Sequence, residues 1–207
     1  MIGLIGKKVG MTQTFDDSGL LTPVTVIEIK NNYVIAQRKA DKEGYNAVLL
    51  GAYEMKKKRV KKPYAGQFPE NITPKKHLRE IRDFDIDCNI GDKLGIELLE
   101  DLRFVDIIGT TKGKGYQGVV KRHGFRGGKR SHGSKFHREA GSTGMAASPS
   151  KVYRGTGMPG RMGAERRTVQ NLRVVKVDKD KQIILVKGAV PGRRGGLVIV
   201  KNAKKKE

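Results

Sequence analysis

A glycine-rich string, Gly113-Lys-Gly115-Tyr-Gln-Gly118, has the G-x-G-x-x-G spacing of dinucleotide-binding turns and kinase glycine loops. In those proteins the glycines let the backbone approach phosphate groups closely. A dinucleotide site also needs a strand before the glycines and a helix that begins inside them. Phe104–Ile108 can supply the strand, but Val119–Gly128 carries three further glycines and predicts no helix. The spacing alone therefore does not predict a nucleotide site.

Basic residues around these glycines offer a different phosphate chemistry. The residues predicted to bind a polyanion are Lys112, Lys114, Lys121, Arg122, Arg126, Lys129, Arg130, Lys135, His137, Arg138, Lys151, Arg154 and Arg161. They alternate with glycines and with the rings of Tyr116, His123, Phe125 and Phe136. Cations neutralise phosphates and rings stack on unpaired bases, so the mixture favours folded RNA. The bland alternative is a flexible glycine linker with solvated lysines.

Other catalytic or metal chemistry is thinly represented. His123, His132 and His137 have one distant Cys88 and no clustered carboxylates, which predicts no metal site. The string Gly141–Gly144 is not a nucleophile elbow, and no Ser-His-Asp or Cys-His arrangement has a usable context. We therefore expect no enzyme activity, no metal and no cofactor. A lone Cys88 is expected to pack without a disulfide, as in a reducing cytoplasm.

The charge is large and unevenly distributed along the chain. The 207 residues carry a net charge of +22. Residues 1–108 contribute +2 of this, residues 109–165 contribute +10 and residues 166–207 contribute +10. Such an excess points to a polyanionic partner. No apolar run approaches membrane length, and the opening MIGLIGKKVG is too short and wrongly ordered for a secretory signal.

The elements that must position these cations are predicted to be mainly β. Branched residues between turn formers predict strands at Val24–Lys30, Tyr33–Lys39, Asn46–Glu54, Lys93–Leu99, Phe104–Thr110, Leu172–Asp178, Gln182–Val190 and Leu197–Asn202. Hairpin connections are predicted at Asn31-Asn32, Asp178–Lys181 and Arg193–Gly196. One helix is predicted at Thr73–Ile81, with Thr73 as N-cap and Pro74 at its first position. Many short strands with few helices favour a closed barrel.

Three segments lie outside this pattern. Aliphatic residues nearly vanish between Phe125 and Val152, so this segment cannot bury enough apolar surface to order itself. We expect it to be a mobile loop when alone, and a functional one because of its length. The basic run Lys56–Lys62 is equally consistent with RNA contact and with a solvated loop. The terminal KNAKKKE is expected to be a basic tail.

Longer motifs give the chain a resemblance. The opening MIGLIGKKVGMTQTF, the late GMPGRMGAERRTVQNLRVV and the segment ILVKGAVPG are similar to bacterial-type large-subunit ribosomal protein three, the universal L-three family. The central signature of that family is matched by Leu99, Asp106, Gly109, Thr111, Gly113-Lys114-Gly115, Gly118 and Arg122. The resemblance covers essentially the whole chain, unlike the bare glycine pattern.

The resemblance implies a six-stranded Greek-key barrel of the translation-protein type, a small α+β insertion and a long basic, irregular extension. It assigns residues 1–55 and 93–124 to the barrel, 56–92 to the insertion and 125–152 to the extension. Residues 153–207 would hold the return of the extension, the closing strands and the tail. The tip would be Met145, Ala146, Ala147, Ser148 and Pro149. Ala147 stands where some members carry an N5-methylated glutamine, so that modification is not expected.

The resemblance also implies function and partners. The barrel would bind 23S-type rRNA early in large-subunit assembly, and the extension would run towards the peptidyl transferase centre. Large-subunit proteins fourteen and nineteen would pack nearby, in a cytoplasmic ribosome, with no membrane and no small-molecule substrate. Two competing hypotheses are an enzyme that uses the glycine loop on a nucleotide, and a general nucleic-acid chaperone. Phosphate contacts carry no sequence information, so composition does not separate the chaperone from a specific rRNA binder.

Overall fold

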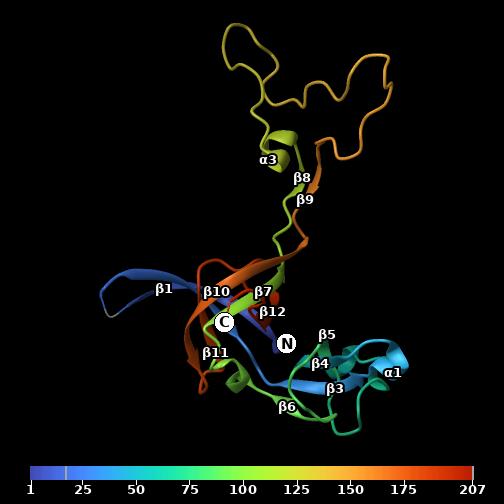
Figure 1. Cartoon of the computed structure of the whole chain (residues 1–207), viewed down its shortest axis with the longest axis vertical. Helices are drawn as coiled ribbons and strands as arrows, with labels where there is room; N and C mark the ends of the chain where they lie inside the picture. The colour runs from blue at the N-terminus through green and yellow to red at the C-terminus, as the bar shows by residue number, and fades with distance from the viewer. Residues whose placement is uncertain (17, 207) are drawn as a thin grey trace. The chain divides into compact units, whose positions relative to one another are not determined.

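The computed structural model describes residues 1–16 and 18–206 (Figure 1). The chain is mainly β, which confirms the predicted class. It divides into two compact units, residues 1–110 with 166–206, and residues 111–165. Among the described residues, no helix is long and apolar enough to cross a membrane.

A closed barrel of six antiparallel strands forms the centre of the first unit, as the sequence predicted. Its strands are β1 (Gly3–Phe15), β2 (Leu21–Glu28), β7 (Phe104–Thr110), β10 (Arg166–Asp178), β11 (Ile183–Lys187) and β12 (Leu197–Asn202). They close in the order β1-β12-β7-β10-β11-β2. The connections from β2 to β7 and from β11 to β12 pass between strands that are not neighbours, which gives the barrel its Greek-key character. Closure leaves the central part of the sheet with no unpaired edge.

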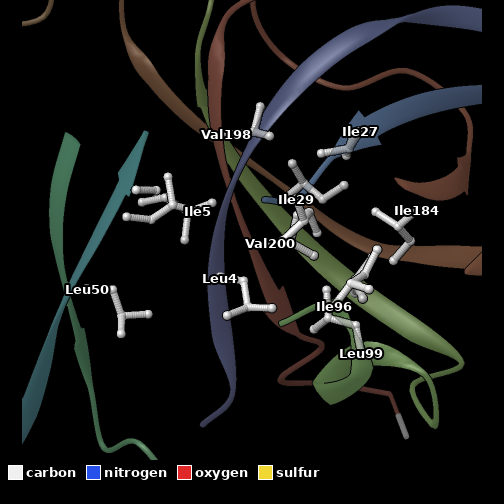
Figure 2. Packing of buried hydrophobic residues seen from close by; sticks show 14 of the residues in the cluster. Leu4, Ile5, Ile27, Ile29, Leu50, Ile96, Leu99, Ile184, Val198 and Val200 are labelled. Carbon is white, nitrogen blue, oxygen red and sulfur yellow. The ribbon is translucent and has the colours of Figure 1, made fainter. Parts of the chain in front are cut away.

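Branched aliphatic side chains fill the interior of this unit. Leu4, Ile107 and Val200 are fully buried in one apolar cluster that continues into the neighbouring sheet. Figure 2 shows Leu4 and Ile5 on opposite sides of β1, as successive residues of a strand must be. Leu4 lies among barrel residues, whereas Ile5 lies towards the strand that carries Leu50. β1 therefore contributes to two packed layers at once.

The second layer is a four-stranded sheet in the order β5-β4-β3-β6. Its strands are β3 (Asn32–Arg38), β4 (Ala47–Glu54), β5 (Lys75–Arg82) and β6 (Lys93–Leu94). Short helical turns connect them: α1 (Ala40–Glu43), η1 (Lys57–Arg59), α2 (Lys62–Ala65) and η2 (Ile96–Leu99). Strands β3 and β4 belong to this sheet and not to the barrel, to which the family resemblance had assigned residues 1–55.

Asn32 explains why the predicted hairpin at Asn31-Asn32 is wrong. The chain leaves the barrel at the end of β2 and enters the second sheet as β3, so these strands do not pair. The buried Asn32 amide accepts a hydrogen bond from the Ile5 N–H at 2.9 Å and donates to the Ile5 carbonyl at 3.2 Å. The side chain thus takes the place of a strand partner for β1 and fixes the crossover between the layers.

The predicted helix at Thr73–Ile81 is also wrong, because this segment forms β5. It pairs along its length with β4, from Ala47 opposite Arg82 to Glu54 opposite Lys75. Burial of Ile81 and of the Lys75 stem against the sheet outweighs the local helix-start signals of Thr73 and Pro74.

Three other local predictions have mixed outcomes. The strand predicted at Lys93–Leu99 stops at Leu94, and η2 then places Ile96 and Leu99 in the core. The hairpin at Asp178–Lys181 is confirmed between β10 and β11. The connection Arg193–Gly196 joins β11 to β12, which are not neighbours, so it is a turn within a crossover.

Candidate nucleic-acid interface

The second unit begins and ends in a pair of short strands, called the neck below. β8 (Gly115–Gln117) pairs antiparallel with β9 (Gly160–Met162). The Thr111 N–H donates to the Glu165 carbonyl at 2.9 Å, and the Lys114 N–H donates to the Met162 carbonyl at 2.9 Å. Gly115 has φ +68, a left-handed conformation that suits glycine and starts β8. The glycine string therefore begins a two-stranded neck, with no βαβ unit around it.

A helix of five residues, α3 (Val119–His123), follows the neck, although none was predicted there. The Val119 side chain is buried within the unit. Gly124 ends the helix in a left-handed conformation, with φ 76. Arg122 Nη1 donates to the Met158 carbonyl at 2.6 Å, and His123 Nε2 lies 3.0 Å from the same oxygen. Because a carbonyl can only accept, this second contact places the His123 proton on Nε2. Both side chains tie the outgoing chain to the returning chain.

Beyond this tie, residues 125–159 contain no helix and no strand. One loop closes locally, where the Gly128 N–H donates to the His137 carbonyl at 3.2 Å. His137 Nδ1 lies 3.0 Å from the Lys129 carbonyl. Within residues 111–165, all of which the structure describes, only Val119 is buried. The unit therefore has almost no core of its own.

All thirteen residues predicted to bind a polyanion lie on the surface of this unit. None of its twelve Lys and Arg side chains forms an ion pair with a carboxylate of the described residues. The structure brings Tyr116 and Arg161 opposite each other across the neck. It uses Arg122 and His137 in internal contacts and distributes the other cations along an open loop.

The predicted tip is exposed as well. Met145 is 75% exposed, and Ala146, Ala147 and Ser148 are on the surface, while Pro149 is half-buried. Exposed rings accompany the cations at Tyr116 (71%) and Tyr153 (53%). Such rings offer flat faces for unpaired bases. No group of three His, Cys, Asp or Glu residues in the described part of the chain is arranged to hold a metal ion.

Sequence reasoning missed a second basic surface, which is on the first unit. The loop from Val190 to Gly196 presents Arg193 and Arg194, both exposed. Buried Lys8 holds this loop, because its Nζ donates to the Val190 carbonyl at 2.6 Å and its own carbonyl accepts the Gly195 N–H at 2.7 Å. A lysine adjacent to another lysine in a sequence reads as a surface residue, so no local signal identified this anchor.

The same loop reaches the end of β7. A Cβ added at Gly109 would lie only 3.0 Å from the Pro191 carbonyl oxygen, so a side chain there would crowd this loop. Arg166 pairs in register with Thr110 and is also exposed. Burial lowers the pKa of Lys201, and the positive charge of Arg166 lowers that pKa further. Positive charge therefore accumulates at this end of the barrel.

Residues 95–183 match the family model described as Ribosomal protein L3. Proteins named large ribosomal subunit protein uL3 match the whole chain. The uL3 of Treponema pallidum (strain Nichols) is 53% identical over 207 residues, which are 100% of each protein. That of Borrelia hermsii is 52% identical over 99% of each, and that of Treponema denticola is 53% identical over 100% of this chain and 99% of its own.

The chain belongs to the ribosomal protein L3 family. Two residues of the L3 signature have structural explanations within the barrel. The buried Asp106 carboxylate accepts hydrogen bonds from the N–H groups of Asn171 (2.8 Å) and Lys204 (3.4 Å). It thereby supports the irregularity in β10 and the start of the basic tail. Gly109 allows the close approach of Pro191. These L3 residues shape the platform and are not exposed towards a ligand.

Proposed function

We propose that this chain is a structural constituent of the large ribosomal subunit that binds 23S-type rRNA directly. The supporting observation is the unit of residues 111–165, which has one buried residue and twelve exposed cations that form no ion pair with the described carboxylates. Ordering its irregular part costs about 1–2 kcal/mol per residue, which its own contacts do not offset. Phosphates of folded RNA would supply that compensation.

The two units would have different roles in rRNA binding. The barrel provides a rigid platform, to which Arg193, Arg194 and Arg166 add phosphate contacts on preordered backbone. The extension, residues 125–152, would become ordered as rRNA folds around it and would run towards the peptidyl transferase centre. It would hold separate rRNA segments in place early in assembly, while the RNA performs peptide-bond chemistry. No catalytic group, cofactor or metal in the protein is needed for this function.

The setting of this function follows from the same family. The protein would act in the cytoplasm as part of the ribosome and support translation. Large-subunit proteins fourteen and nineteen are its expected protein neighbours. The weakly polar residues of the tip, Met145 to Pro149, suit close packing against RNA better than base readout.

The direct experiment compares two RNAs of equal length, a large-subunit rRNA fragment and an unrelated folded RNA, across a salt series. We expect at least about tenfold tighter binding to the rRNA fragment, retained at high salt, as for a specific complex. Equal affinities that decline together with salt would contradict the proposal and favour a general nucleic-acid chaperone. If the chain were a nucleotide-binding enzyme, ATP, GTP or NAD would raise its thermal unfolding temperature. We expect no such increase.

A further inference from the structure

The β1–β2 hairpin extends past the barrel as a two-stranded ribbon of residues 9–16 and 18–23 (Figure 1). β12 pairs with β1 only from Gly3 to Lys7, and β11 pairs with β2 only from Val24 onwards. Among the described residues, no other strand pairs with the outer edges of the ribbon. A two-stranded ribbon is marginally stable in water, and an uncovered edge invites another chain.

Hydrogen bonds link the described residues at the end of the ribbon. Asp16 Oδ1 accepts hydrogen bonds from the Ser18 hydroxyl at 2.7 Å and from the Leu20 N–H at 2.8 Å. The Gly19 N–H donates to the Asp16 carbonyl at 2.9 Å. These bonds to the carboxylate, that of the Ser18 hydroxyl first, lower the pKa of Asp16. Asp16 therefore keeps its negative charge at neutral pH.

One face of the ribbon exposes several large apolar side chains beside Gln13. Phe15 pairs in register with Leu21, and Gln13 pairs with Pro23, so these residues share a face with Met11. Met11 is 52% exposed, Phe15 66% and Leu21 51%. The opposite face carries hydroxyl side chains, with Thr14 paired to Thr22. The two faces of the ribbon therefore differ in polarity, and neither face packs on the barrel core.

The charge of this ribbon differs from that of the extension and of the loop of residues 190–196. Residues 9–29 contain no Lys, Arg or His but three acids, Asp16, Asp17 and Glu28, in a chain of net charge +22. Binding to RNA depends on cations that neutralise phosphates, and the ribbon's own residues supply none. Protein interfaces are instead enriched in aromatic residues and Met and depleted in Lys. The composition therefore fits a protein partner.

We propose that this ribbon is a docking arm for a basic protein, which packs an apolar patch on Met11, Phe15, Leu21 and Pro23. The acidic tip complements a positively charged partner and steers its approach. The inference rests on the proposed function in that the partner belongs to the same rRNA particle. In this proposal the ribbon contacts a protein, whereas the extension and the loop of residues 190–196 contact RNA.

A photo-crosslinking amino acid at Phe15 tests this in assembled large subunits, with the same probe at Tyr116 as the matched RNA-facing control. We expect the Phe15 adduct to survive nuclease and to contain a second protein with net positive charge, whereas the Tyr116 adduct contains RNA. An RNA adduct at Phe15, an adduct of two copies of this chain, or an acidic partner would overturn the proposal. So would no adduct at Phe15 when Tyr116 gives one. Absence of both variant chains from subunits would instead contradict the proposed function.

A pair of double variants gives an independent readout. Phe15→Ser with Leu21→Ser removes the apolar face, and Thr14→Ala with Thr22→Ala alters the adjacent pair on the opposite face. We expect the first to weaken binding of the purified cross-linked partner by about tenfold or more, as for truncated aromatic anchors. Both should leave the rRNA affinity and its salt dependence unchanged. Equal partner affinity in the two double variants, or a loss of rRNA affinity in the first, would refute the docking role.

Discussion

Replacing the six cations between Arg126 and Lys151 by glutamine should weaken rRNA binding by a predictable amount. The residues are Arg126, Lys129, Arg130, Lys135, Arg138 and Lys151, all exposed and without ion pairs among the described residues. Each neutralised phosphate contributes about 0.7–0.9 to the slope of log affinity against log salt. If all six bind phosphate, the slope should fall in magnitude by about 4–5. Raising the salt from 50 to 200 mM weakens rRNA binding of each protein by a certain factor. That factor should be about 300 to 1,000 times smaller for the variant than for the native chain.

The matched control removes the same charge elsewhere. The run Lys56–Lys62 also holds six exposed cations, so its six-glutamine variant has the same net charge as the extension variant. Filter binding or fluorescence anisotropy over a salt series measures both slopes, and denaturant unfolding checks the barrel. No residue from 126 to 151 is buried, so the free energy of unfolding should change by less than about 0.5 kcal/mol. An unchanged slope in the extension variant, or a loss no larger than that of the Lys56–Lys62 variant, would refute the assignment of the extension as the main phosphate-binding segment.

Three further predictions concern the first unit. Leu4→Ala should lower the free energy of unfolding by about 2–5 kcal/mol in denaturant titration, because Leu4 is fully buried. Arg193→Gln with Arg194→Gln should reduce the salt slope for rRNA by about 1.4–1.8 without destabilising the barrel, since both side chains are exposed. Burial lowers the pKa of His77, so the unfolded chain binds the proton more tightly and stability should fall as pH drops from above 6.5. Thermal unfolding of His77→Gln should lose that part of the pH dependence; an unchanged pH profile would contradict it.

Strand content could be predicted from sequence because branched residues recur between turn formers, as at Phe104–Thr110, which matches β7 residue for residue. Pairing could not be predicted in the same way. Asn31-Asn32 has good turn chemistry, yet Asn32 bonds to Ile5 from another strand and the chain changes sheets. Likewise, the start signals at Thr73 and Pro74 are genuine local preferences, but pairing with β4 overrides them. Local sequence preference therefore indicates where strands and turns can form. Contacts with residues distant in the sequence decide how the strands pair and which local preferences are overridden.

The candidate interface was predictable for a related reason. A segment such as 125–152 has few long-range partners within the chain, so its composition describes it almost completely. Absence of aliphatic residues predicted absence of a core, and the structure has one buried residue in the whole of 111–165. The barrel loop with Arg193 and Arg194 escaped notice because what makes it a defined surface is Lys8, which lies 182 positions before Val190 in sequence.

Lysines in this chain therefore serve two physically different purposes that composition cannot separate. Lys8 is buried, and its ammonium group is bound by backbone carbonyls, so its charge shapes a loop. Lys75 is likewise buried, 4.0 Å from the ring centroid of Tyr33 and 3.5 Å from Glu54. A buried cation with protein partners is not available to a phosphate, because releasing it would leave those partners unsatisfied. The net charge of +22 therefore does not give the number of phosphates bound, because some of the 43 Lys and Arg side chains are buried. The cations that the fold leaves exposed determine the salt dependence.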